Sequence, residues 1–231
     1  MLKYRKKWCL EVKKLIAVSY VVAIVITLYW GIWSLNQVIQ KGVRRSILGL
    51  VIVMLGLSLT GLLQVFAVDE APNLERWLWY WQCMFSNLMS LCIVIMASVT
   101  GKPVNKDYMT KWEIALISLH LVVNALVLTN DWHGLINLDR YMYGFVNRTN
   151  SFSWLFSLAF ILESGEMLFG IGWMFLKARR DKILNNRMLL PLVLLFCVHF
   201  YHVFALYGGL IWGLIPANVI YILLIIYYFY S

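Results

Sequence analysis

Four residues that could act together chemically lie in two apolar segments in the second half of the chain. Glu163 and Glu166 interrupt the apolar stretch ILESGEMLFG, and His199 and His202 interrupt CVHFYHVF. Each pair is spaced i, i+3, so in a helix its two members lie on one face. Two carboxylates and two imidazoles can form hydrogen-bonded pairs, exchange protons near neutral pH, or coordinate zinc or iron.

The positions of these pairs along the chain predict that they meet. A short loop joins the two apolar segments, so we expect an antiparallel hairpin centred near Lys182. Glu163 and His202 lie almost equally far from that centre, and so do Glu166 and His199. Each glutamate is therefore expected to meet one histidine near mid-bilayer, where a buried charge needs a partner. Three interpretations stay open: an interhelical clamp, a proton- or ligand-sensing cluster, and a metal site.

A second polar set lies in the preceding apolar segment, ISLHLVVNALVLTNDWHGL. His120 and Asn124 are spaced i, i+4 and share a helix face, and for His120 we expect a hydrogen bond to another helix. Asn130, Trp132 and His133 follow at the predicted outer membrane surface. These five residues are the candidate ligand-sensing residues.

The composition indicates that all of these residues lie in a membrane. The chain of 231 residues is 62% hydrophobic and only 13% charged, whereas soluble domains have about 25% charged residues. The apolar residues form runs of about 20, the length that crosses a bilayer core as a helix. We therefore predict an all-α, polytopic membrane protein, a seven-transmembrane helix bundle. Its spans are approximately residues 15–35, 46–68, 78–99, 113–129, 152–176, 188–207 and 210–230, after a basic N-terminal tail of residues 1–14.

Lysine and arginine predict the orientation of this bundle. The net charge of +9 comes mostly from residues between the apolar runs, which indicates topology and not nucleic-acid binding. The first, third and fifth connections carry eleven Lys or Arg, and the second and fourth carry three. This favours an outer N-terminus and a cytoplasmic C-terminus in the plasma membrane, although the N-terminal tail adds six basic residues on the outer side.

The tract LTNDWHGLINLD resembles a known family. Thr129, Asn130, His133 and Leu135 match a T-N-x-x-H-x-L tract at the outer end of the fourth span in the seven-helix N-terminal sensor region of bacterial histidine kinases. That region also precedes diguanylate cyclases and other output domains. The resemblance covers the whole chain in layout, and it implies an outer N-terminus and an outward-facing sensory surface near His133. The Glu/His cluster is not part of it.

These observations predict a sensory receptor module of a bacterial signal-transduction protein, such as a two-component system. It would detect a small ligand, a proton or a membrane state and relay it through the last helix to a cytoplasmic kinase, cyclase or regulator outside this chain. The lipid bilayer is the expected partner, and a homodimer is one arrangement of the receptor. We expect no catalysis and no cofactor in the chain itself. One alternative is a metal-dependent intramembrane hydrolase that binds zinc or iron through Glu163, Glu166, His199 and His202. Another is a structural membrane subunit.

Overall fold

The computed structural model describes residues 2–67, 71–99, 110–133, 154–180, 194, 197 and 217–230. Nearly all of these residues lie in helices, and no strand occurs among them. The helices are α1 (Leu2–Gln37), α2 (Lys41–Ala67), α3 (Pro72–Val99), α4 (Lys111–Leu128), α5 (Asn130–His133), α6 (Trp154–Arg180) and α8 (Ala217–Tyr230). The all-α prediction is therefore confirmed for this part of the chain.

Four segments of these helices are long and apolar enough to cross a membrane: Lys13–Gln37, Lys41–Ala67, Asn73–Val99 and Lys111–Leu128. They coincide with the first four predicted spans and support a membrane protein. Helix α6 covers most of the fifth predicted span, and α8 covers the later part of the seventh. The sixth predicted span, residues 188–207, lies outside the described residues apart from Leu194 and Cys197.

Local sequence explains where several helices begin. Helix α1 starts at Leu2, so the basic tail is continuous with the first span, because no glycine or proline interrupts the chain before Gly31. Helix α3 begins at Pro72, a residue suited to the first helical position because its backbone lacks an N–H. At the start of α4, a side-chain oxygen of Glu113 accepts a hydrogen bond from the backbone N–H of Thr110 at 2.7 Å.

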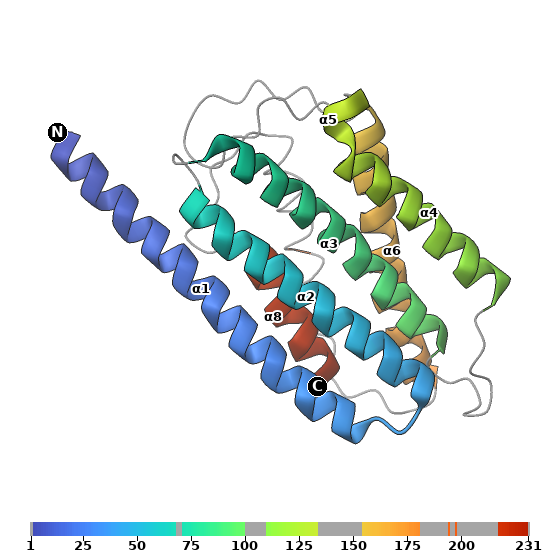
Figure 1. Ribbon diagram of the computed structural model, residues 1–231. Helices are drawn as coiled ribbons and strands as arrows, with labels where there is room; N and C mark the ends of the chain where they lie inside the picture. The colour runs from blue at the N-terminus through green and yellow to red at the C-terminus, as the bar shows by residue number, and fades with distance from the viewer. Residues whose placement is uncertain are drawn as a thin grey trace.

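Helix α3 is the centre of the bundle and packs against α2, α4 and α6 (Figure 1). Helix α1 packs on α2, and α8 packs on both α1 and α2. Hydrogen bonds between these helices show that α6 runs parallel to α3 and that α4 runs antiparallel to it. Helices α1 and α8 end at the same end of the bundle (Figure 1).

The backbones of α3 and α6 approach closely at one glycine. A Cβ atom added to Gly170 would lie 2.8 Å from Cγ2 of Ile93 and 3.3 Å from backbone atoms of Ile93 and Val94. Only a residue without a side chain fits at that distance. One helical turn before Gly170, the same face of α6 carries Glu166, so this close approach also places Glu166 against α3.

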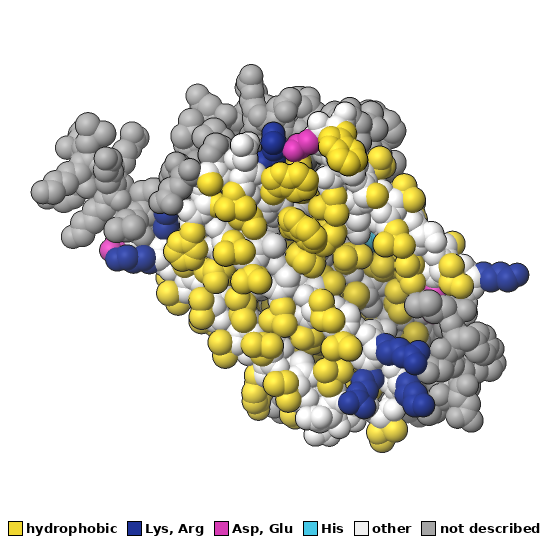
Figure 2. Space-filling model, viewed as in Figure 1, with side chains coloured by type: hydrophobic (Ala, Val, Ile, Leu, Met, Phe, Trp, Pro, Cys, Tyr) yellow, Lys and Arg dark blue, Asp and Glu magenta, His cyan; other side chains and the backbone are white. Residues whose placement is uncertain are grey.

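The surface has the distribution expected for contact with lipid. In Figure 2 hydrophobic side chains cover the middle of the visible face, and lysine, arginine and acidic side chains lie towards its ends. Large apolar side chains such as Val25 on α1, Leu121 on α4 and Ile161 on α6 are more than half exposed. Contiguous apolar surface of this kind is rare on soluble monomers and agrees with a membrane location.

Candidate functional site

Three polar residues on the middle of α3 form the base of the candidate site. Ser86 and Ser90 are one helical turn apart and face α6, whereas Asn87 faces α4. Besides its contact with α6, the hydroxyl of Ser90 donates to the backbone carbonyl of Asn87 at 2.9 Å. Because this helix packs against three others, polar groups at its middle are withdrawn from lipid.

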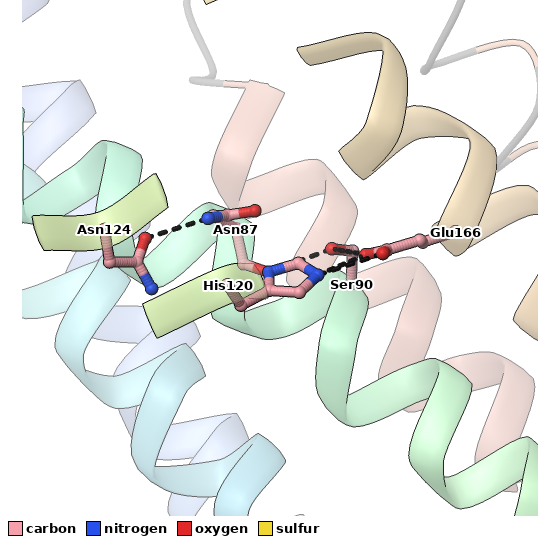
Figure 3. A network of polar contacts seen from close by, with 5 residues as sticks. All are labelled: Asn87, Ser90, His120, Asn124 and Glu166. Atoms are coloured by element: carbon pink, nitrogen blue, oxygen red, sulfur yellow. Dashed lines mark hydrogen bonds and ion pairs between the residues drawn. The ribbon is translucent and has the colours of Figure 1, made fainter. Parts of the chain in front are cut away.

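His120 and Glu166 form the central contact of the site. Nε2 of His120 lies 2.9 Å from Oε1 and 2.8 Å from Oε2 of Glu166, so an N–H at Nε2 can donate to the carboxylate. The hydroxyl of Ser90 donates to Oε2 of the same carboxylate at 3.0 Å. Figure 3 shows these side chains converging from α4, α3 and α6. A single carboxyl group therefore joins three helices, and His120 is fully buried.

Two further contacts extend the arrangement on either side. Glu163 accepts a hydrogen bond from the hydroxyl of Ser86, which ties α6 to α3 a second time. Nδ2 of Asn87 donates to Oδ1 of Asn124 at 2.8 Å, which ties α3 to α4 (Figure 3). We call the whole set the polar network, and its members are Ser86, Asn87, Ser90, His120, Asn124, Glu163 and Glu166.

The network concentrates ionisable groups in a helix bundle. Two carboxyl groups face one imidazole, and the amine of Lys177 on α6 is directed elsewhere, to the carbonyl of Ala97 at 3.2 Å. Pairing and hydrogen bonding reduce the cost of burying such groups. Carboxyl and imidazole groups in contact take up and release protons as a coupled unit. The arrangement can therefore store a proton or change its hydrogen bonding when a ligand competes for Glu166.

A second group of polar residues lies at the C-terminal end of α4. Asp131 on α5 accepts a hydrogen bond from the Tyr80 hydroxyl at 2.7 Å and pairs with Arg76 at 3.2 Å. Asn130 is buried and its side-chain amide lies 3.4 Å from the same hydroxyl. Trp132 is 88% exposed, which suits an indole at the membrane interface. These contacts join the short helix α5 to the start of α3.

The structure separates the predicted site residues into two groups. His120 and Asn124 belong to the polar network, together with Glu163 and Glu166. Asn130 lies against Tyr80, whereas Trp132 is exposed on α5 and His133 ends that helix. The predicted partners of the glutamates, His199 and His202, lie outside the described residues. The partners that the structure gives to Glu166 are His120 and Ser90.

Sequence reasoning missed the role of two serines. Ser86 and Ser90 are spaced i, i+4 on α3 and match the two glutamates spaced i, i+3 on α6. That matching spacing could have indicated that the serines bond to the glutamates. Serine is common in membrane helices, however, so the spacing alone carries little weight. Sequence reasoning also overlooked Glu113 of α4, which is buried and accepts a hydrogen bond from the Ser98 hydroxyl of α3.

The predicted metal site stays a prediction. Within the described ranges, no group of three or more His, Cys, Asp or Glu is arranged to hold a metal ion. Two of the four predicted ligands, His199 and His202, lie beyond those ranges. No family model, no curated protein and no solved structure matches this chain.

Proposed function

We propose that this chain is a membrane-embedded receptor module whose polar network holds α3, α4 and α6 in one of two arrangements. The observation that supports this most is the position of Glu166, which bonds to Ser90 on α3 and to His120 on α4 at once. A change in the charge of this carboxyl, or a ligand that competes for it, alters both contacts together. A receptor needs such an element, because a signal can shift only an equilibrium between states with different contacts.

The packing offers a route from the network to the last helix. Met167 and Ile171 of α6 belong to the same buried apolar cluster as Ile222 and Ile225 of α8. Because α6 packs on α3, α3 on α2 and α2 on α8, a shift of α6 can reach α8 through these helices. We propose that α8 carries the signal to a cytoplasmic kinase, cyclase or regulator domain. The small-molecule or proton input, a bacterial plasma membrane and a homodimeric receptor belong to the same proposal.

The proposed orientation makes the first prediction. Helices α1 and α8 run in the same direction (Figure 1), so the two ends of the chain lie on opposite sides if both helices cross the membrane. We expect reporter fusions at Leu2 and Ser231 to place the N-terminus outside and the C-terminus in the cytoplasm. Fusion of the same reporters to the chain with its basic residues 3–14 neutralised is the control for the basic tail. A cytoplasmic N-terminus with an outer C-terminus would contradict the proposal.

The second prediction tests for two arrangements directly. Nitroxide labels at Leu121 on α4 and Phe169 on α6, both more than half exposed, report the distance between these helices in lipid nanodiscs. The labels are attached to cysteines introduced at these two positions, and the native cysteines are replaced so that they are not labelled. We expect pulsed electron paramagnetic resonance to show two populations of label-to-label distance. In Glu166→Gln the ratio of these populations should change about tenfold, because the neutral amide weakens the attachment of α4 to α6.

The matched control for this measurement is Glu113→Gln. It neutralises another buried carboxyl that joins α4 to α3 but lies outside the polar network. We expect the ratio of populations to stay at its original value. One unchanging distance in the original chain and in Glu166→Gln would instead show that the network is scaffolding, as a structural subunit requires.

A further inference from the structure

The first turn of α2 carries three basic residues on one face. Lys41, Arg44 and Arg45 are spaced i, i+3 and i+4, and all three are exposed. Figure 2 shows lysine and arginine side chains gathered at the end of the visible face where α2 begins. Three cations within one helical turn repel one another, so an anion placed beside them is attracted by all three. This turn therefore offers a binding surface for a negatively charged group.

Hydrogen bonds fix the start of α2 against the rest of the bundle. Nε2 of Gln40 donates to the backbone carbonyl of Val99 at 3.1 Å, which ties the residue before α2 to the last residue of α3. The backbone N–H of Arg44 donates to the carbonyl of Gln40 at 2.9 Å. The backbone that carries the three cations is therefore ordered before any ligand arrives, which lowers the entropic cost of binding.

The acidic residue that the structure describes at this end of the bundle faces inward. It is Glu113, which lies near the start of α4 and bonds to Ser98 near the end of α3. Its side chain is buried, and its oxygens accept from the Ser98 hydroxyl and from the backbone N–H of Thr110. Because this carboxyl group is engaged inside the bundle, the positive potential of the first turn of α2 extends into the surroundings.

An exposed apolar stripe continues the same face of α2 beyond the cations. Leu48 lies four residues after Arg44, and Ile52 and Leu59 follow at intervals of four and seven residues. These three side chains are 46%, 56% and 51% exposed. A molecule that matches both features has an anionic head and hydrocarbon chains.

We propose that the first turn of α2 binds the phosphate headgroup of an anionic phospholipid, whose acyl chains lie along the apolar stripe. A guanidinium group donates two hydrogen bonds to phosphate oxygens at once, and a lysine adds a point charge. Helix α2 is long and apolar enough to cross a membrane, so its first turn lies at the depth of lipid phosphates. An acidic protein surface would match the cations but not the exposed apolar stripe. The inference uses the membrane location of α2 and does not depend on the receptor function.

Quenching of a fluorophore by brominated lipid tests the proposal. The full chain, with its native cysteines replaced and Leu48→Cys labelled with bimane, is reconstituted into bilayers of phosphatidylcholine and phosphatidylglycerol. Bromine is carried by the acyl chains of one lipid or of the other. Because bromine quenches only a fluorophore beside it, the two series give the ratio of the association constants of the two lipids at this position. We expect phosphatidylglycerol to be favoured about tenfold.

Leu63→Cys is the matched control position. Leu63 lies on the same face of α2 and is 46% exposed, as Leu48 is, but it is about 22 Å further along the helix. We expect the ratio of association constants to be close to one there. Equal preferences at both positions would show a general enrichment of anionic lipid around the protein and would overturn the proposal. A ratio near one at position 48 would also overturn it and would leave the cations to an acidic partner protein.

Two variants with equal losses of charge assign the preference to α2. Replacement of the three basic residues of its first turn by glutamine should return the ratio at position 48 to about one. The control variant carries Lys111→Gln, Arg179→Gln and Arg180→Gln, three exposed residues on α4 and α6 at the same end of the bundle, and should keep the tenfold preference. Equal losses in both variants would mean diffuse attraction to this end of the bundle and would overturn a site on α2. If the first variant does not fold, the comparison of positions 48 and 63 decides by itself.

Discussion

Glu166→Leu is expected to lower the free energy of unfolding by about 3 kcal/mol, because it leaves a buried imidazole without its partner. Nε2–H of His120 loses its acceptor, and the hydroxyl of Ser90 loses one of its two acceptors, the carboxylate of Glu166. His120→Leu should cost a similar amount, since it leaves the carboxyl of Glu166 without its imidazole. The variant with both substitutions should lose clearly less free energy of unfolding than the sum of the losses in the two single variants. Reversible unfolding in mixed micelles with an increasing fraction of denaturing detergent, followed by tryptophan fluorescence, measures all three.

The control for this cycle is an exposed ion pair that also contains a glutamate. Glu11 and Lys14 on α1 are 3.3 Å apart, and both side chains are more than half exposed. Such pairs contribute little, so Glu11→Leu should leave the unfolding midpoint nearly unchanged. If Glu166→Leu had no larger effect than Glu11→Leu, the His120–Glu166 contact would not stabilise the bundle.

Gly170→Ala is expected to lower the free energy of unfolding by about 2 kcal/mol, because the new methyl group pushes α6 away from α3. The atoms it would meet include backbone atoms of Ile93 and Val94, which cannot move aside as the end of a side chain can. Glu166 lies one turn away and would be displaced from Ser90. The same detergent titration measures the stability, and the distance between labels on α4 and α6 measures the displacement.

Gly172 provides a control two residues further along the same helix. A Cβ atom there would meet nothing within 4 Å. Gly172→Ala should therefore keep or raise the stability, because alanine favours the helix by about 1 kcal/mol over glycine. Equal losses of stability in the two variants would mean that general disturbance of α6, and not the close approach to α3, causes the effect.

Hydropathy alone predicted most of the described helices but not their ends. Each of the first four predicted spans matches one helix, although the second and fourth end one residue after α2 and α4 do. The starts differ more: α3 begins at Pro72 and not at Leu78, and α1 begins at Leu2. Apolar runs mark the residues that need the hydrocarbon core, whereas a helix continues into the interface as long as its residues favour it. The start at Pro72 follows from the special suitability of proline for a first turn.

The membership of the polar network was predicted better than its pairing. His120, Asn124, Glu163 and Glu166 were all identified as candidates, because polar residues inside apolar spans are costly. Loop lengths could suggest partners only between neighbouring spans. Which faces of α3, α4 and α6 meet depends on the packing of the whole bundle, including the close approach at Gly170, and one sequence does not specify it.

The parallel alignment of α3 and α6 restricts how these helices can slide. Glu163 is held by Ser86 and Glu166 by Ser90, and the two serines are one helical turn apart. A displacement of α6 by half a turn would separate both carboxyls from their serine hydroxyls, whereas a full turn of about 5.4 Å towards the C-terminal end of α3 would bring Glu163 to Ser90. The spacing of the two serines therefore favours displacement of α6 along α3 by a whole helical turn over displacement by part of a turn.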